Sequence, residues 1–299
     1  MHILSSWLPT QRKVAIDLGT AYIRMASRDL GLVTIPLGNR PRALLRDGVV
    51  ADPHGVAGIL RPLLGKTRRL GTGPNVAVGI PTDTSFKERK ALHLAMCAAG
   101  AGHVEIVPEP QAAALGAGLE VDLPYAHMIV DIGEGVTDGA IIREGTLLHA
   151  FAVRIGCGTL REQVRAGYRR RWGIELAWNE AERILEQAGV SARSFASGAV
   201  PGSPPAEAAA GNHDHNPAAI HAFVEPGVTA ILSAISAQLR DIPHQLGCEI
   251  IESGITLTGG GALLSGMREC LSAATSIKVT VPQNPLDAVV KGLQQILDA

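Results

Sequence analysis

The sequence contains few aromatic residues and has no excess of charge of either sign. Phe, Trp and Tyr make up only 3% of its 299 residues, and the formal net charge is -1. Without a basic surplus the chain lacks the overall attraction that draws proteins to nucleic acid. Apolar residues are 46% and charged residues 18%, which is typical of a globular chain. We therefore expect a small-molecule or protein partner and no nucleic acid.

Cysteine is also scarce. The four cysteines, Cys97, Cys157, Cys248 and Cys270, are far apart and never form a C-x-x-C. This spacing argues against both a structural zinc site and a disulfide framework. A reducing, cytoplasmic location fits this pattern.

Long hydrophobic runs are absent as well. No apolar run reaches the about 20 residues that cross a bilayer, and no basic segment with an apolar core and a cleavage site begins the chain. The first nine residues, MHILSSWLP, place their apolar side chains at helical spacing on one side. They form either a short anchor at the membrane periphery, on its inner face, or a frayed tail that packs on the body.

Two stretches share one pattern. RKVAIDLGTAYIRMASRD and HMIVDIGEGVTDGAII each predict an apolar strand that ends in Asp, an apolar residue and Gly, followed by a second strand. This repetition predicts two related lobes. We expect the first at residues 12 to 125 and the second at residues 126 to 299.

The segments between and after these stretches alternate between strand and helix patterns. NVAVGIP and HVEIV predict strands, whereas FKERKALHLAMCAA, TLREQVRAGYRRRW and NEAERILEQA predict helices. Such alternation indicates an α/β fold. The arginines at 169 to 171 are most simply a solvated helix face, with a specific anionic partner as the alternative.

Residues 190 to 226 are rich in Ala, Pro, Gly and Ser and predict a flexible surface loop. Within it, His213, Asp214 and His215 are metal-ligand types, but a solvated polar turn explains them more simply.

Three glycine turns carry the candidate chemistry. Asp17-Leu18-Gly19-Thr20 and Asp131-Ile132-Gly133 place carboxylates at strand ends, beside glycines whose backbone can approach phosphate oxygens. Gly259-Gly260-Gly261 is expected to open a helix, whose free N–H groups favour a phosphate. Each turn alone is common, but the three in this order are specific.

Together these motifs resemble the MreB/Mbl family of bacterial actin-like proteins. AIDLGTA and VDIGEGVTDGAII match the family's two phosphate loops, EPQAAALGAGL its Glu-Pro segment and GITLTGGGALLSGM its adenosine motif. The resemblance implies an actin-like ATPase fold of class α/β, with two lobes, each a mixed sheet with flanking helices, around a nucleotide cleft. Since only residues 31 to 46 stand where the family inserts a small upper subdomain, that subdomain of the first lobe is expected to be reduced or absent.

The resemblance also implies a site for ATP and Mg²⁺. Glu109 would orient the attacking water. Asp17 and Asp131 would form the Mg²⁺ shell through water. The other residues implied to bind the nucleotide are Asp17, Gly19, Thr20, Ala21, Gly133, Gly135, Gly156, Glu182, Gly259, Gly260 and Gly261.

Several positions depart from the family pattern. Glu134 stands where the family has glycine and Val136 where it has threonine. An unpaired carboxylate about 4 Å from a phosphate charge would repel it by about 4 kcal/mol at an effective dielectric near 20. Tyr22 replaces a small polar residue, Cys157-Gly158 a Gly-Asp pair and Leu185 a lysine. We therefore expect weakened nucleotide binding and still weaker hydrolysis.

These observations predict a cell-shape or cell-wall morphogenesis protein that works with itself or with a fuller actin-like paralogue. One alternative is an active filament-forming ATPase, in which Glu134 tilts outward and Thr137 supplies the missing hydroxyl. A small-molecule kinase of the same superfamily is a weaker alternative, because the chain has no evident substrate-binding insertion.

Overall fold

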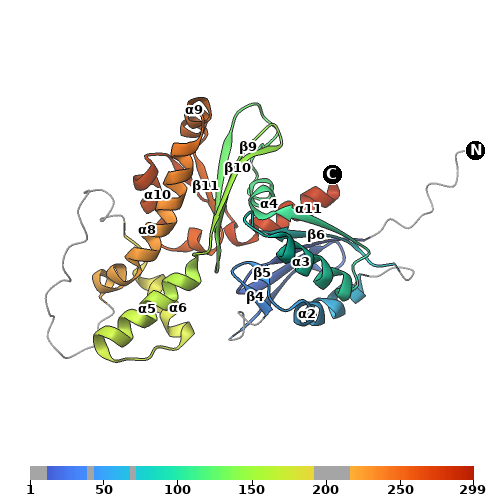
Figure 1. Ribbon diagram of the computed structural model, residues 1–299, viewed down its shortest axis with the longest axis horizontal. Helices are drawn as coiled ribbons and strands as arrows, with labels where there is room; N and C mark the ends of the chain where they lie inside the picture. Colours follow the sequence, from blue (N-terminus) through green and yellow to red (C-terminus); the bar gives the residue numbers. More distant parts are fainter. Residues whose placement is uncertain (1–11, 39–43, 68–71, 192–215) are drawn as a thin grey trace, which may run out of the picture. The chain divides into compact units, whose positions relative to one another are not determined.

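The computed structural model describes residues 12–38, 44–67, 72–191 and 216–299. The chain forms two compact units, shown in Figure 1. The first comprises Met1–Gly116 and Asp287–Ala299, and the second Ala117–Leu286. We expected the C-terminal helix in the second lobe, and this is wrong: it packs with the first unit.

The first unit is built on a five-stranded sheet of order β3-β2-β1-β6-β7. Its strands are β1 (Lys13–Leu18), β2 (Tyr22–Ser27), β3 (Gly31–Pro36), β6 (Asn75–Ile80) and β7 (His103–Pro108). The first three are antiparallel, and β6 and β7 run parallel to β1. The hairpin expected at the start of the chain is therefore confirmed, with Asp17 opposite Arg24.

Four helices cover this sheet: α2 (Pro53–Lys66), α3 (Phe86–Ala99), α4 (Glu109–Gly116) and α11 (Ala288–Asp298). Side chains alternate along β1, so Val14, Ile16 and Leu18 join the core formed with α2 and α3. Ala15 and Asp17 point to the opposite face, which α11 covers. Helix α3 begins at Ser85, whose hydroxyl forms a capping box with Glu88.

The described residues between β3 and α2 are 37–38 and 44–52. In the described part of this stretch only β4 (Leu45–Arg46) and β5 (Val49–Val50) form, as a two-stranded hairpin. This agrees with the expected reduction of the upper subdomain of the first lobe.

The second unit repeats the strand plan of the first. Its sheet has the order β10-β9-β8-β11-β12. The strands are β8 (His127–Ile132), β9 (Thr137–Arg143), β10 (Thr146–Val153), β11 (Ile255–Thr258) and β12 (Val279–Thr280). Three antiparallel strands are again followed by two parallel ones. The internal repeat that the sequence suggested therefore appears as two sheets of one topology.

The helices of the second unit enclose its larger core. They are α5 (Cys157–Trp172), α6 (Trp178–Ala188), α8 (Pro217–Asp241), α9 (His244–Ser253) and α10 (Met267–Thr275), with short 3-10 helices at η2 (Gly260–Leu263) and η3 (Pro285–Asp287). The expected loop over residues 190 to 226 is wrong from residue 217 onward. Asn216 caps α8, and the buried Ile220 and Val224 hold its first turns on the core.

Helix α8 alone among the described helices is long and apolar enough to cross a membrane by length and composition. Half of its most apolar window is buried within the structure. It packs against α5, α6 and α10 (Figure 1), so its apolar side chains serve the core of this unit.

Candidate functional site

The first phosphate loop is the tight turn between β1 and β2. A side chain at Gly19 would lie 2.9 Å from the carbonyl oxygen of Tyr22, so the turn requires glycine there. The hydroxyl of Thr20 is buried and accepts a hydrogen bond from the N–H of Gly48 at 3.0 Å. Thr20 therefore ties the loop to the β4–β5 hairpin, and the partly buried Ala21 follows it.

Asp17 ends β1 and lies next to an arginine. Its carboxylate is 3.6 Å from Arg24, which also lies 3.7 Å from Asp287 at the start of α11. Burial raises the pKa of Asp17 to about 6; Arg24 opposes this shift and Asp287 adds to it. Burial thus disfavours the ionised form of the Asp17 carboxyl group.

Glu109 opens helix α4 and is buried. A carboxylate at this end of a helix is favoured by the helix dipole. A side chain at Gly79 would lie 3.0 Å from the Cγ of Glu109 and 3.3 Å from Val289 in α11. Asp17 and Glu109 thus both lie at the beginning of α11, on the same face of the first sheet.

The second phosphate loop, between β8 and β9, repeats the geometry of the first. The N–H of Gly133 donates to the carbonyl of Val136 at 2.9 Å. The N–H groups of Cys157 and Gly158, in the first turn of α5, donate to the carbonyls of Gly133 and Glu134. Any side chain at Gly156 would collide with these two carbonyls. The loop and the start of α5 therefore form one packed unit, and Gly135 lies within it at partial exposure.

The adenosine motif packs on the same loop. The hydroxyl of Thr258 lies 3.3 Å from the carboxylate of Asp131, and a side chain at Gly259 would collide with that carboxylate. Gly261 packs against Ile132, and a side chain at Gly260 would lie 3.7 Å from the sulfur of Cys157. The helix expected after these glycines forms in two parts: the 3-10 helix η2 at Gly260–Leu263 and, after the extended Leu264, the α-helix α10 at Met267–Thr275.

Glu134 is not an isolated negative charge. Its carboxylate forms an ion pair with Arg161, one turn into α5. A second nitrogen of Arg161 lies 2.6 Å from Glu182 in α6, and the guanidinium lies 5.0 Å from the ring centre of Trp178. We expected an unpaired Glu134 carboxylate to repel a phosphate. In this structure Arg161 pairs with that carboxylate, so the expected repulsion does not apply. Arg161 was not predicted from the sequence. The signal that could have found it was the negative charge of Glu134, which needed a cation in the helix that follows.

Thr137 does not supply a hydroxyl to the loop. It is fully buried in β9 and donates to the carbonyl of Ile155 at 2.8 Å. The ATPase alternative in which Thr137 replaces the missing threonine is therefore wrong in that detail, since alternation along the strand turns the side chain away. The buried Val136 offers no donor in its place.

The thiol of Cys157 lies beside these groups but is unreactive. Burial, with Asp131 and Glu182 nearby, raises the pKa of its thiol to about 12. Leu185, at the position expected to carry a lysine, is buried in the core of the second unit.

Within the second unit, then, the structure brings together Asp131, Gly133, Gly156 and Gly259 to Gly261, with Glu182 joined through Arg161. The first unit gathers its own set: Asp17, the Gly19–Ala21 turn and Glu109. Carboxylate oxygens of this kind suit a hydrated Mg²⁺ ion, although Asp17 shares its charge with Arg24. Among the described residues no three His, Cys, Asp or Glu side chains form a direct metal cage.

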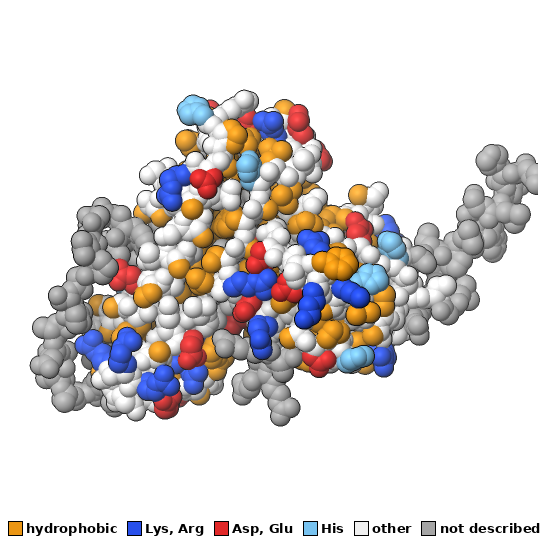
Figure 2. All heavy atoms as spheres, in the orientation of Figure 1, with side chains coloured by type: hydrophobic (Ala, Val, Ile, Leu, Met, Phe, Trp, Pro, Cys, Tyr) orange, Lys and Arg blue, Asp and Glu red, His pale blue; other side chains and the backbone are white. Residues whose placement is uncertain are grey.

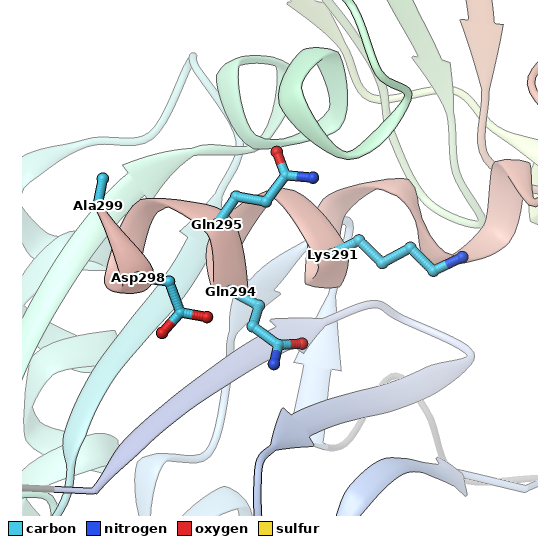
Figure 3. Close-up of a pocket in the computed structure, with 5 residues that line it drawn as sticks. All are labelled: Lys291, Gln294, Gln295, Asp298 and Ala299. Carbon is cyan, nitrogen blue, oxygen red and sulfur yellow. The ribbon is translucent and has the colours of Figure 1, made fainter.

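Other predicted features lie elsewhere. Residues 1 to 9 and His213 to His215 fall outside the described residues. Arg169, Arg170 and Arg171 are exposed in the last turn of α5, and Figure 2 shows Lys and Arg side chains gathered where α5 and α6 lie. A surface hollow on α11, lined by Lys291, Gln294, Gln295, Asp298 and Ala299 (Figure 3), contains none of the predicted site residues.

Comparison with known proteins identifies the family. The family pattern of the MreB/Mbl proteins matches residues 39–299. This chain belongs to the MreB/Mbl family. It is 26% identical to the cell shape-determining protein Mbl of Bacillus subtilis (strain 168), covering 96% of each chain. It is 33% identical to the cell shape-determining protein MreB of Escherichia coli (strain K12), covering 83% of this chain and 73% of that protein.

Solved structures of the actin-like fold superpose on the whole MreB/Mbl-family chain. MreB5 of Spiroplasma citri bound to AMPPNP gives a TM-score of 0.80 at 22% identity, covering 97% of this chain and 96% of that one. A MamK double helical filament gives 0.70 at 17% identity, covering 96% and 99%. At these identities the likeness establishes the fold, which is the actin-like α/β fold that the motifs implied.

Proposed function

We propose that this chain is a cell-shape cytoskeletal protein that binds adenine nucleotide loosely and has residual or no ATPase activity. The observation that carries the proposal is the packing of Asp131, the second phosphate loop, the start of α5 and the Gly259–Gly261 turn on one another. Glycines at such a place suit a phosphate and a nucleoside, because without a side chain the backbone can approach the ligand closely. The names of the Mbl and MreB relatives and the AMPPNP-bound MreB5 support the same role.

In this proposal Asp17 and Asp131 would each act as an acidic residue of the Mg²⁺ shell through water, as the family resemblance implies, and the ion would neutralise phosphate charge. Gly19, Thr20 and Ala21 approach the phosphates from the first loop, and Gly133 and Gly135 from the second. Gly156 and Gly259 to Gly261 border the nucleoside, and Glu182 accepts from the ribose hydroxyls. Glu109 orients a water molecule if hydrolysis occurs.

The weak hydrolysis rests on Val136, whose buried side chain lacks the hydroxyl that a threonine would offer. Loss of one preorganised donor lowers a rate by roughly two to three orders of magnitude. Calorimetry with ATP and ADP in the presence of Mg²⁺ tests the binding, and phosphate release tests the turnover. We expect affinities weaker than micromolar and slow release; submicromolar binding or no binding at all would contradict the proposal.

An active filament-forming ATPase is the competing function, and the buried Glu109 at the start of α4 favours it. The two are separated by measuring phosphate release as protein concentration rises. A cooperative increase supports the active ATPase, whereas a slow rate that stays proportional to concentration supports the first proposal.

We further propose that the chain assembles with itself or with a fuller actin-like paralogue, in the cytoplasm and at the inner face of the membrane through residues 1 to 9. The MamK filament supports assembly of this fold, and the short β4–β5 hairpin favours a paralogue as partner. Sedimentation with and without such a paralogue tests the assembly. Sedimentation of the chain alone would support self-assembly, whereas sedimentation only in the mixture would support assembly with the paralogue.

A further inference from the structure

The carboxylate of Glu134 lies against the first turn of α5. A side chain at Gly158 would come within 2.7 Å of a Glu134 carboxylate oxygen, so glycine at 158 leaves the space that Glu134 occupies. The backbone of the same two residues is joined by the hydrogen bond from Gly158 N–H to the Glu134 carbonyl, at 2.8 Å. Glu134 is therefore fixed on α5 by both its backbone and its side chain.

Arg161 follows one turn later on the same helix, with its side chain 8% exposed. It pairs with Glu134, which is 14% exposed, and with the more exposed Glu182. Two carboxylates thus share one guanidinium, whose flat face also lies over Trp178. Because Glu134 and Arg161 are shielded from water, the attraction between their charges is stronger than in an exposed pair.

We propose that Arg161 is a positioning residue that cancels the charge of Glu134 and thereby keeps the second phosphate loop able to accept an anion. This inference rests on the proposed nucleotide binding and names the group that permits it despite Glu134. Gly158 and Arg161 act together: the first makes room for the carboxylate and the second neutralises it. Arg161 also holds Glu182, so the ribose carboxylate and the phosphate loop are linked through one side chain.

Loss of Arg161 should change the affinities for different ligands by different amounts, because charge at this loop acts on phosphates and not on the nucleoside. Without Arg161 the loop gains one net negative charge, and repulsion grows with the number of phosphates on the ligand. Affinity should therefore fall most for ATP, less for ADP and least for adenosine. A merely structural role would weaken all three ligands alike.

The experiment is calorimetry of the full chain with ATP, ADP and adenosine at constant Mg²⁺. Arg161→Gln is expected to weaken ATP binding roughly a hundredfold and adenosine binding less than threefold. The double variant Glu134→Gln, Arg161→Gln has the net charge of the wild type and should return to within about threefold of it. Arg161→Lys, which keeps the cation, should lose less ATP affinity than Arg161→Gln.

Arg165→Gln is the matched control. Arg165 lies one turn further along α5, with its guanidinium 6.0 Å from the centre of the same Trp178 ring. It pairs with Glu162 and donates to the carbonyl of Leu176. Its loss should leave all three affinities unchanged. Thermal unfolding of each nucleotide-free variant shows whether it is folded; should Arg161→Gln fail to fold, Arg161→Lys and the double variant carry the comparison.

Equal losses for ATP and adenosine, or no recovery in the double variant, would overturn the inference while leaving the proposed function intact. A wild-type chain that binds none of the three ligands would overturn the proposed function and this inference with it.

Discussion

The carboxylate of Asp17 lies 3.6 Å from the guanidinium of Arg24, directly across the first hairpin. The arginine does not fully offset the burial of the carboxyl group, so the pKa stays raised at about 6, against 3.8 in the unfolded chain. Asp287 lies next to the same arginine and adds to the increase, while Lys291 lies 3.8 Å from Asp287. The ionised form of Asp17, which we propose as a residue of the Mg²⁺ shell, is therefore disfavoured by its burial and by Asp287.

The raised pKa predicts how Asp17 changes the free energy of unfolding with pH. Because the native pKa is the higher one, the native state binds the proton more tightly, and the stabilisation by Asp17 is present at low pH and lost as pH rises through about 6. Between pH 5 and pH 7.5 this loss is on the order of 1 kcal/mol.

The Asp17→Asn variant cannot titrate and should lack this contribution. In urea unfolding of the nucleotide-free protein, the free energy of unfolding of the variant should therefore rise relative to that of wild type by about 1 kcal/mol between pH 5 and pH 7.5. A difference between the two proteins that stays constant over this range would show that the pKa of Asp17 is not raised.

A second prediction concerns the contact between α4 and α11. A side chain at Gly292 would collide with the carbonyl oxygen of Ala112, and one at Gly116 with that of Ala288. Gly292→Ala must therefore separate the two helices and should lower the free energy of unfolding by about 2 to 3 kcal/mol.

Gly65→Ala in α2 is its control, because a side chain there meets nothing within 4 Å. The same exchange should there be neutral or stabilising by up to about 1 kcal/mol, owing to the higher helix propensity of alanine. Urea unfolding of both variants measures the contrast. Similar losses in both would mean that the tight helix contact is absent.

The cysteines provide a third prediction. Cys157 and Cys270 are buried, which raises the pKa of their thiols to about 12 and about 11, whereas Cys97 and Cys248 are exposed. Since the thiolate is the reactive form, iodoacetamide at pH 8 should modify Cys97 and Cys248 in the native protein and all four cysteines in denaturant. Peptide mass spectrometry reads the positions, and rapid native labelling of Cys157 would contradict its placement under the Gly260 turn.

Much of this architecture could be predicted from sequence because its signals are local. The Asp17 and Asp131 hairpins are apolar strands broken by glycine, and each motif is encoded within a few residues. The C-terminal helix was assigned to the wrong lobe because the helix that it packs against, α4, is distant in sequence. Gly292 indicates a close contact, but it does not show which helix makes that contact. Arg161 was missed for the same reason: the sequence gives the charge of Glu134, but only folding brings Arg161 to it.

The last prediction combines the two unusual residues of the second loop. In the double variant Glu134→Gly, Val136→Thr, Arg161 keeps only Glu182 as a partner, so the loop gains one net positive charge, and the new threonine adds a hydroxyl donor. ATP affinity should rise by roughly tenfold or more, and phosphate release by roughly a hundredfold.

The single variants divide these effects between the two residues. Glu134→Gly should act mainly on affinity, because it changes the charge of the loop, and Val136→Thr mainly on the rate, because it adds a donor without charge. Calorimetry and phosphate release on all four proteins complete the comparison. If the double variant matches wild type in both quantities, neither Glu134 nor Val136 limits binding or turnover, and the proposed role of this loop in weakening hydrolysis is wrong.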